Sequence, residues 1–142
     1  MKIKSIMSAK LVTVEMDDTL STIKEIFDNT NFHHLLVVEG AKLFGVISDR
    51  DLLKALHPNV DTPAATDKDL ASLNKKAHQI MTRKPLSIHE EASIKEVVEL
   101  FNNNTISCVP VVNSNNEPIG IISWRDIMKE IGQRMNKSNE RT

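Results

Sequence analysis

The sequence contains few cysteines and few aromatic residues. Cys108 is its only cysteine, and its 142 residues include one tryptophan, four phenylalanines and no tyrosine. A single cysteine allows neither an intrachain disulfide nor a thiolate metal cluster, and it favours a reducing, cytoplasmic location. The shortage of aromatic rings also excludes the stacking surfaces with which many proteins hold single-stranded nucleic acid.

Excess charge and long apolar runs are missing too. The formal net charge is −1, whereas a general nucleic-acid binder needs clustered Lys and Arg to neutralise phosphates. No apolar run approaches the ~20 residues that span a bilayer, and residues 1–10 lack the apolar region of a signal peptide. We therefore expect a cytoplasmic protein that binds neither nucleic acid nor a membrane.

What the sequence does have is an internal repeat. Three segments recur in the same order: Ile6-Met7-Ser8 as Ile80-Met81-Thr82, Val37-Val38 as Val111-Val112, and Gly45-Val46-Ile47-Ser48 as Gly120-Ile121-Ile122-Ser123. The spacing is 74 residues for the first two pairs and 75 for the third. The extra residue falls within 113–116, where a hairpin turn tolerates it. A repeat that changes length only at a turn indicates a duplicated structural unit.

Each copy predicts the order strand, helix, strand, strand, helix. The elements of the first copy are expected at 11–14, 20–27, 34–39, 42–47 and 49–56, and those of the second at 86–88, 93–102, 108–112, 119–122 and 123–131. One such layer cannot cover both faces of its sheet, but two layers back to back can. The sequence therefore predicts an α+β fold in which two repeats form one pseudo-twofold domain.

The boundaries follow from the same pattern. We expect the repeats at 1–57 and 77–133, with a linker at 58–76 that contains one short helix at 67–74. The mildly basic residues that close the chain predict a flexible tail at 134–142.

The segments Gly45–Asp51 and Gly120–Asp126 are the candidate sites, because each ends a strand and opens a helix. A helix N-terminus offers free backbone N–H groups and the positive end of the helix dipole. A serine and an aspartate three residues apart share one face of the first turn. There the carboxylate can accept hydrogen bonds from a ribose diol, while the hydroxyl donates or accepts nearby.

The same Ser-x-x-Asp pattern also resembles a capping box, in which the two side chains satisfy the helix's own backbone. Two details favour a ligand. The capping box prefers Glu or Gln where both copies have Asp, and both copies place an arginine, Arg50 or Arg125, in the first turn. A cation there is unfavourable by roughly 0.3–1 kcal/mol, which suggests a bound anion. The alternative, that Arg50 pairs with Asp49 or Asp51, stays open.

Together these marks resemble the CBS domain, and the pair resembles a Bateman module, over 6–56 and 80–131. The resemblance implies a non-catalytic regulatory or sensor module that forms a homodimer. Its ligand would be AMP, ADP, ATP or a molecule like S-adenosylmethionine, bound in clefts between the repeats. By this resemblance Ser48 and Asp51 hold the ribose in one site, and Ser123 and Asp126 hold it in the other.

The middle strands differ between the copies, so the two sites should be unequal. In similar proteins this strand often carries a proline, which Pro110 supplies in the second copy and Leu36 replaces in the first. His33 and His34 could face a phosphate, which would raise their pKa values. The alternative is that one histidine is a surface residue and the other packs as a neutral ring. The full set of candidate ligand-binding residues is Ser48, Arg50, Asp51, Ser123, Arg125, Asp126, His33, His34, Thr13, Ser87 and Pro110.

Catalysis and metal binding are not predicted. The five histidines and Cys108 lack the spacing of metal ligands. Neither site serine has the histidine and aspartate partners of a nucleophile, and no cofactor is expected. The final helices, 49–56 and 124–131, carry apolar stripes that predict the homodimer face, and a separate effector protein is a candidate partner. Two alternatives remain: an enzyme acting on nucleotides, and an interaction module with vestigial nucleotide sites.

Overall fold

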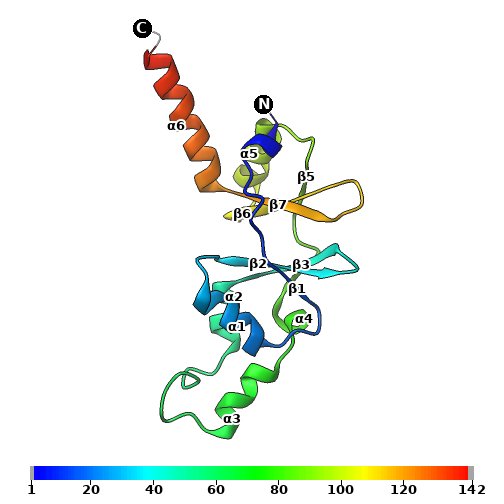
Figure 1. The fold of residues 1–142 in the computed structure, drawn as a ribbon, viewed down its shortest axis with the longest axis vertical. Helices are drawn as coiled ribbons and strands as arrows, with labels where there is room; N and C mark the ends of the chain where they lie inside the picture. Colours follow the sequence, from blue (N-terminus) through cyan, green and yellow to red (C-terminus); the bar gives the residue numbers. More distant parts are fainter. Residues whose placement is uncertain (1, 141–142) are drawn as a thin grey trace. The chain divides into compact units, whose positions relative to one another are not determined.

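The computed structural model describes residues 2–140 of the chain, shown in Figure 1. The chain forms two compact units. The first unit consists of Val12–Pro85, and the second combines Met1–Leu11 with Leu86–Thr142.

The first unit contains a four-stranded sheet with helices on one face. Its elements are β1 (Thr13–Glu15), α1 (Leu20–Asn29), β2 (His34–Glu39), β3 (Lys42–Ser48), α2 (Asp49–Ala55), α3 (Asp67–Leu70), η2 (Ala71–Asn74), α4 (Ala77–Ile80) and β4 (Thr82–Arg83). The strand order is β1-β2-β3-β4, with β1 parallel to β2 and the other neighbours antiparallel. Gly40 and Ala41 both have positive φ in the tight turn between β2 and β3, where a two-residue hairpin loop requires it.

The second unit repeats the plan with a three-stranded sheet. Its elements are η1 (Ile3–Ser5), β5 (Ile88–His89), α5 (Ile94–Asn103), β6 (Cys108–Val112), β7 (Pro118–Ser123) and α6 (Trp124–Glu140). The strand order is β5-β6-β7, with β5 parallel to β6 and β6 antiparallel to β7. The predicted order of strand, helix, strand, strand, helix is confirmed in both copies.

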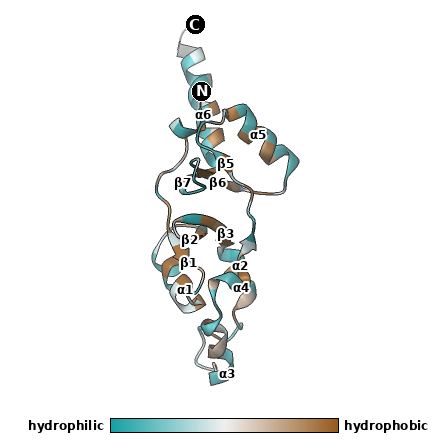
Figure 2. Cartoon of the chain, turned by 90° about the vertical axis from the view of Figure 1, so that its right-hand side faces the viewer, coloured by the Kyte–Doolittle hydropathy of each residue, from teal (hydrophilic) through white to brown (hydrophobic). Residues whose placement is uncertain are grey.

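Each unit has its own apolar core between its sheet and its helices. The hydrophobic residues, brown in Figure 2, gather on the strands of each sheet. The first core includes Leu20, Ile23, Leu35, Val37 and Ile47, and the second includes Ile3, Val97, Val109, Val111 and Ile122. Alternate residues of a strand point to opposite faces, so the residues between these core positions lie on the other face of the sheet.

The segments at the start of each sequence repeat are exchanged between the units. Thr82 in β4 pairs with Val46 of β3 in the first unit, whereas Ser8 pairs with Ile121 of β7 in the second. The methionine of each exchanged segment packs against a glycine. A Cβ atom on Gly45 would collide with the Met81 side chain, and one on Gly120 would collide with Met7. The compact units are therefore divided differently from the repeats in the sequence.

The end of the chain differs from the sequence-based expectation. Helix α6 runs through Glu140 rather than ending at Ile131, so the described part of the predicted flexible tail is helical. No proline interrupts this stretch, and Arg134 pairs with Glu130 one turn earlier; such spacing supports a helix. Residues 141–142 of that tail lie outside the described part of the chain. The linker contains the expected short helix, as α3 followed by η2.

None of the helices between residues 2 and 140 is both long enough and apolar enough to cross a bilayer.

Candidate functional site

In the first unit, Ser48 and Asp51 bond to each other's backbone. The Ser48 backbone N–H donates to Asp51 Oδ2 at 2.9 Å, and the Asp51 N–H donates to Ser48 Oγ at 3.1 Å. This reciprocal pair is a complete capping box at the start of α2. Both side chains are only half-buried, so they are not sealed inside the unit.

The second unit repeats this geometry at the start of α6. The Ser123 N–H donates to Asp126 Oδ2 at 2.8 Å, and the Asp126 N–H approaches Ser123 Oγ at 3.4 Å. The Ser123 hydroxyl also donates to Asp126 Oδ2 at 3.1 Å. The sequence repeat is thus a repeat of side-chain geometry as well.

The capping alternative is therefore what the structure contains, and the argument from the choice of aspartate was wrong. A third capping box, between Thr66 and Asp69 in the linker, also uses Asp, with bonds of 3.0 and 3.2 Å. There too the aspartate carboxylate accepts from the backbone N–H of the cap residue. Aspartate in this position therefore does not distinguish a cap from a ligand site.

Capping leaves hydrogen-bond acceptor positions free on the carboxylates of Asp51 and Asp126. In both pairs the backbone bond is made to Oδ2, whereas an ionised carboxylate has about four acceptor positions over its two oxygens. Asp51 and Asp126 can therefore hold their own helix start and still accept hydrogen bonds from a ligand.

The two arginines of the motif are exposed. Among the ion pairs of residues 2–140, none involves Arg50 or Arg125. The alternative in which Arg50 pairs with Asp49 or Asp51 is thus not what the structure shows. Both guanidinium groups are available to an anion.

Asp49 has a different partner. Its Oδ2 lies 3.0 Å from Nδ1 of His33, and this hydrogen bond is the largest cause that lowers the pKa of Asp49 below its ordinary value. The His33 side chain is otherwise mostly exposed, as the alternative of a surface histidine expected.

His34 is the register partner of Ser48 across β2 and β3. Burial lowers the pKa of His34 below its ordinary 6.5, and the nearby charge of Asp49 opposes this only in part. This agrees with the alternative in which one histidine packs as a neutral ring. A raised pKa would require an anion such as a phosphate beside the ring.

The pairing register brings several of the predicted residues onto one sheet face. Thr13 pairs with Leu36, and Leu36 pairs with Val46, two residues before Ser48. Because register partners point to the same side of a sheet, Thr13, His34, Leu36 and Ser48 share the face opposite the core. This places them together in the first unit.

The second unit offers different side chains at the matching positions. Cys108 pairs with Ser123, and Pro110 pairs with Ile121. Cys108 therefore stands where the first unit has His34, and Pro110 stands where it has Leu36. Ser87 lies just before β5 and is half-buried. The two candidate sites are chemically unequal, as the sequence predicted.

Two neighbouring side chains of this second site are structural. Burial raises the pKa of the Cys108 thiol to about 12, which makes it an inert group at neutral pH. Trp124 packs on Phe101 with ring centroids 5.7 Å apart, and its Nε1 donates to the backbone oxygen of Ile106 at 3.1 Å. Across residues 2–140, no group of three or more His, Cys, Asp or Glu side chains is placed to hold a metal ion.

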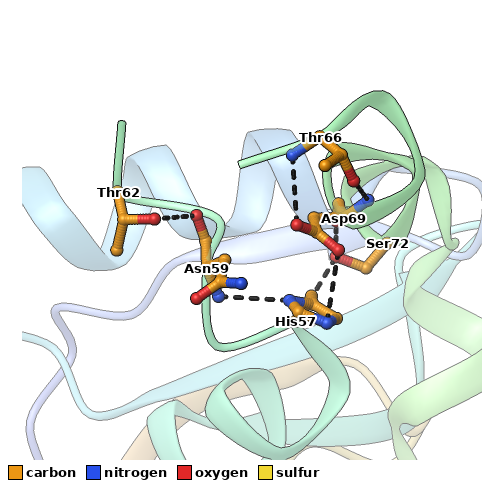
Figure 3. A network of polar contacts seen from close by, with 6 residues as sticks. All are labelled: His57, Asn59, Thr62, Thr66, Asp69 and Ser72. Atoms are coloured by element: carbon orange, nitrogen blue, oxygen red, sulfur yellow. Dashed lines mark hydrogen bonds and ion pairs between the residues drawn. The ribbon is translucent and has the colours of Figure 1, made fainter. Parts of the chain in front are cut away.

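Sequence reasoning missed one polar network, which lies in the linker (Figure 3). His57 Nδ1 accepts from the Asn59 backbone N–H at 3.1 Å, while Nε2 lies 3.3 Å from Asp69 Oδ1. The His57 backbone N–H donates to Ser72 Oγ at 3.2 Å. The hydrogen bond from the Thr66 backbone is the largest cause that lowers the pKa of Asp69. These contacts fasten the linker loop to α3 and η2. The Thr66–Asp69 pair follows the capping pattern that the sequence shows elsewhere, whereas no sequence pattern signals the contacts of His57.

The fold and the duplicated helix starts define a paired-repeat module of the Bateman type. The sequence profile of the CBS domain matches residues 3–58 and 77–133. The chain belongs to the CBS domain family, which confirms the resemblance noted in the sequence and the α+β fold expected from it.

Two curated relatives illustrate the match. The chain is 33% identical over 129 residues to uncharacterized protein MJ1404 of Methanocaldococcus jannaschii, an alignment that covers 89% of the chain but 27% of that protein. It is 28% identical over 131 residues to a CBS domain-containing protein of Dictyostelium discoideum, covering 89% of the chain and 88% of that protein. The chain therefore spans only a fraction of some relatives and nearly all of others.

Two solved structures illustrate the fold. The CBS domain pair of protein MJ0100, in complex with 5′-methylthioadenosine and S-adenosyl-L-methionine, has a TM-score of 0.75 and 27% identity, covering 94% of this chain and 98% of that one. Protein MJ1225 of Methanocaldococcus jannaschii has a TM-score of 0.82 at 23% identity, covering 94% of this chain and 51% of that one. The second of these supports the fold alone.

Proposed function

We propose that the chain is a non-catalytic regulatory module that binds adenosine-type ligands at two unequal sites, one at Ser48 and Asp51 and the other at Ser123 and Asp126. The observation that carries this proposal is the recurrence of one geometry. Both units place a half-buried serine–aspartate pair at a helix start, with spare acceptor positions on the carboxylate. Beside each pair lies an arginine that forms no ion pair with any other residue in the described part of the chain.

The relatives support an adenosine ligand. The MJ0100 domain pair, at 27% identity, was solved with two adenosine-containing molecules. In this chain the carboxylates would accept hydrogen bonds from the ribose hydroxyls, and the exposed Arg50 and Arg125 would face a phosphate or another acidic group. AMP, ADP, ATP and S-adenosylmethionine all present a ribose, so the proposal covers the class and the test identifies the member.

Some relatives are enzymes, but their chemistry does not carry over. The chain covers 21% of an inosine-5′-monophosphate dehydrogenase and 23% of an L-aspartate semialdehyde sulfurtransferase, both of Methanocaldococcus jannaschii. A match to about a fifth of a protein identifies a shared module rather than a shared reaction. Incubation with ATP and product analysis would detect turnover, which this proposal excludes.

A bound ligand would regulate by changing how much of the protein is in each of its possible arrangements. A ligand favours whichever arrangement of the protein it binds more tightly, and the effect cannot exceed the difference between its two affinities. We propose a homodimer as the responding assembly, with α2 and α6 as its face. The exposed large apolar residues of these two helices are Leu53, Trp124, Met128, Ile131 and Met135. A separate effector protein would bind one arrangement of that dimer in preference to the other. We place the protein in the cytoplasm, where Cys108 stays reduced.

A thermal-shift screen against AMP, ADP, ATP, S-adenosylmethionine, NADH and cyclic dinucleotides tests the proposal. A ligand at ~100 times its dissociation constant stabilises the folded state by ~2.7 kcal/mol. Calorimetric titration of the hits then gives the number of sites. A shift with at least one adenosine compound is expected, and the absence of any shift would reject the ligand class.

A second candidate function is an interaction module whose nucleotide sites are vestigial. The complete capping boxes favour it, because Ser48, Asp51, Ser123 and Asp126 already have a structural use that would preserve them without a ligand. This candidate predicts a dimer or partner complex that forms normally while no nucleotide in the screen binds.

A further inference from the structure

The two units differ in one backbone hydrogen bond beside the middle strand. In the first unit, the Leu36 N–H donates to the Val12 oxygen at 3.1 Å. Pro110 stands at the matching position of the second unit, and a proline has no N–H to donate. The carbonyl that matches Val12 belongs to Leu86, 74 residues further along the chain. The proline therefore leaves this carbonyl without its strand partner.

The missing bond also shortens the neighbouring strand. β1 pairs with β2 over three residues that begin at Thr13, the register partner of Leu36. β5 pairs with β6 over two residues only, beginning at Ile88. Ser87, which matches Thr13, lies outside the ladder, because the residue opposite it is Pro110. The backbone that precedes β5 is therefore not held by the middle strand.

The Leu86 oxygen has no hydrogen-bond partner within the described chain. No donor from any residue between 2 and 140 reaches it. Leu86 is also exposed, and a backbone oxygen is a strong acceptor that is normally paired. In the second unit this oxygen is thus open to a ligand, whereas in the first unit the matching oxygen of Val12 already bonds to Leu36.

The free oxygen lies within reach of the site at Ser123 and Asp126. Pro110 pairs with Ile121, which lies two residues before Ser123 on β7. Ser87, next to Leu86, lies one strand further across. Strand spacings of about 4.8 Å per strand and about 6.8 Å along two residues place the Ser87 Cα roughly 12 Å from that of Ser123. A nucleoside whose sugar is held at Ser123 and Asp126 spans this distance with its base.

We propose that the Leu86 oxygen accepts a hydrogen bond from an amino group on the ligand's base, and that the two sites therefore differ in base specificity. The second site, with Pro110, selects a base that carries an amino group, such as adenine, over one that carries an oxo group, such as hypoxanthine. The first site does not distinguish the two, because Leu36 occupies the matching oxygen. This inference rests on the proposed function and names the residues that set the ligand preference of each site.

The test compares ligands that differ only at this position of the base: AMP with IMP, and S-adenosylhomocysteine with S-inosylhomocysteine. Calorimetric titration of Asp51→Ala measures the second site, and titration of Asp126→Ala measures the first. At the second site the amino compound should bind about tenfold more tightly, because the oxo compound loses one hydrogen bond and turns an oxygen toward a carbonyl. At the first site the two members of each pair should bind within about twofold of each other.

A substitution at Pro110 tests the cause of this preference. Pro110→Leu restores an N–H opposite the Leu86 oxygen, so in the Asp51→Ala background it should reduce the preference to about twofold. Leu36→Pro makes the reverse change and should create a preference in the Asp126→Ala background. Pro118→Leu replaces a strand proline at the opposite end of β7 from Ser123, and as the matched control it should keep the preference. Thermal melting checks that every variant folds, and Pro110→Leu decides the matter if Leu36→Pro does not.

The outcomes separate the two levels of the proposal. If the unmodified protein binds none of the four compounds, the adenosine function itself fails. Loss of binding in both aspartate variants would reject two independent sites, on which the inference depends. If the second site binds but shows no preference for the amino compound, if the preference survives Pro110→Leu, or if the first site shares it, the role of the Leu86 oxygen is overturned while the function stands.

Discussion

His34 lies directly opposite Ser48 across the β2–β3 ladder. This pairing places a titratable ring beside the first candidate site, whereas the second unit has Cys108 opposite Ser123. The two sites therefore differ in how they respond to protons.

Acid should destabilise the protein through His34. Since burial holds the pKa of His34 below 6.5 in the folded state, the unfolded chain binds more protons as the pH falls through 6.5. The free energy of unfolding then decreases with falling pH in this window. The lowered pKa of Asp49 acts separately, near and below its ordinary 3.8. Urea titrations between pH 5 and pH 8 should show a smaller loss in His34→Gln than in the unmodified protein, and an equal loss would contradict the assignment.

Asp51→Ala and Asp126→Ala should each weaken ribose ligands. Losing a charged acceptor costs on the order of 1.5–3 kcal/mol, or roughly ten- to a hundredfold in affinity. Each variant also loses part of a cap, which costs about 0.5–2 kcal/mol of stability. Asp69→Ala is the matched control, because it breaks the same kind of capping box in the linker. Calorimetry should find full affinity in Asp69→Ala, and unchanged affinity in both site variants would remove the ribose assignment.

Substitution of the glycines that contact the exchanged segments should lower the free energy of unfolding. Gly45→Ala and Gly120→Ala force a methyl group against Met81 or Met7, and such overpacking costs about 1–3 kcal/mol. Gly132→Ala in α6 meets nothing within 4 Å. There the greater helix propensity of alanine should stabilise by up to about 1 kcal/mol. Chemical denaturation compares the three variants, and a neutral Gly45→Ala would show that the close contact is absent in solution.

Ile3→Ala should loosen the second unit and leave the first intact. Ile3 is fully buried in the second core, so the truncation should cost about 2–5 kcal/mol. Hydrogen exchange should lose protection in β6 and β7 while β2 and β3 keep theirs. Loss of protection in β2 and β3 alone would mean that the N-terminal segment packs on its own sequence repeat.

Helix α6 should carry a dimer contact on one face. Trp124, Met128, Ile131 and Met135 are all exposed, and at about 100° per residue they fall within one stripe. Met128→Lys should therefore shift the protein to monomer in analytical ultracentrifugation. Gln133→Lys adds the same charge on the opposite side of α6 and should leave the dimer unchanged. A monomeric unmodified protein would reject this face.

The sequence was sufficient for the parts of the fold that repeat. The second appearance of Gly-x-Ile-Ser and the apolar periods identified the strands and the helix starts at Ser48 and Ser123. It was insufficient where a contact depends on distant segments. Thr82 and Arg83 form a strand only because β3 lies beside them, and two residues carry no periodicity. The capping bonds of Asp51 and Asp126 depend on side-chain rotamers, which residue preferences did not reveal.

The exchanged segments also determine how the protein can be divided into fragments that keep their cores. A fragment excised at the repeat boundary, residues 77–142, would leave Ile3 and Met7 behind and so lack part of its own interior. Residues 12–85 instead keep the contact between Met81 and Gly45 within one compact unit. A fragment grafted into another protein should therefore have the boundaries of a compact unit rather than those of a sequence repeat. The same holds for a variant in which the order of the two halves is exchanged.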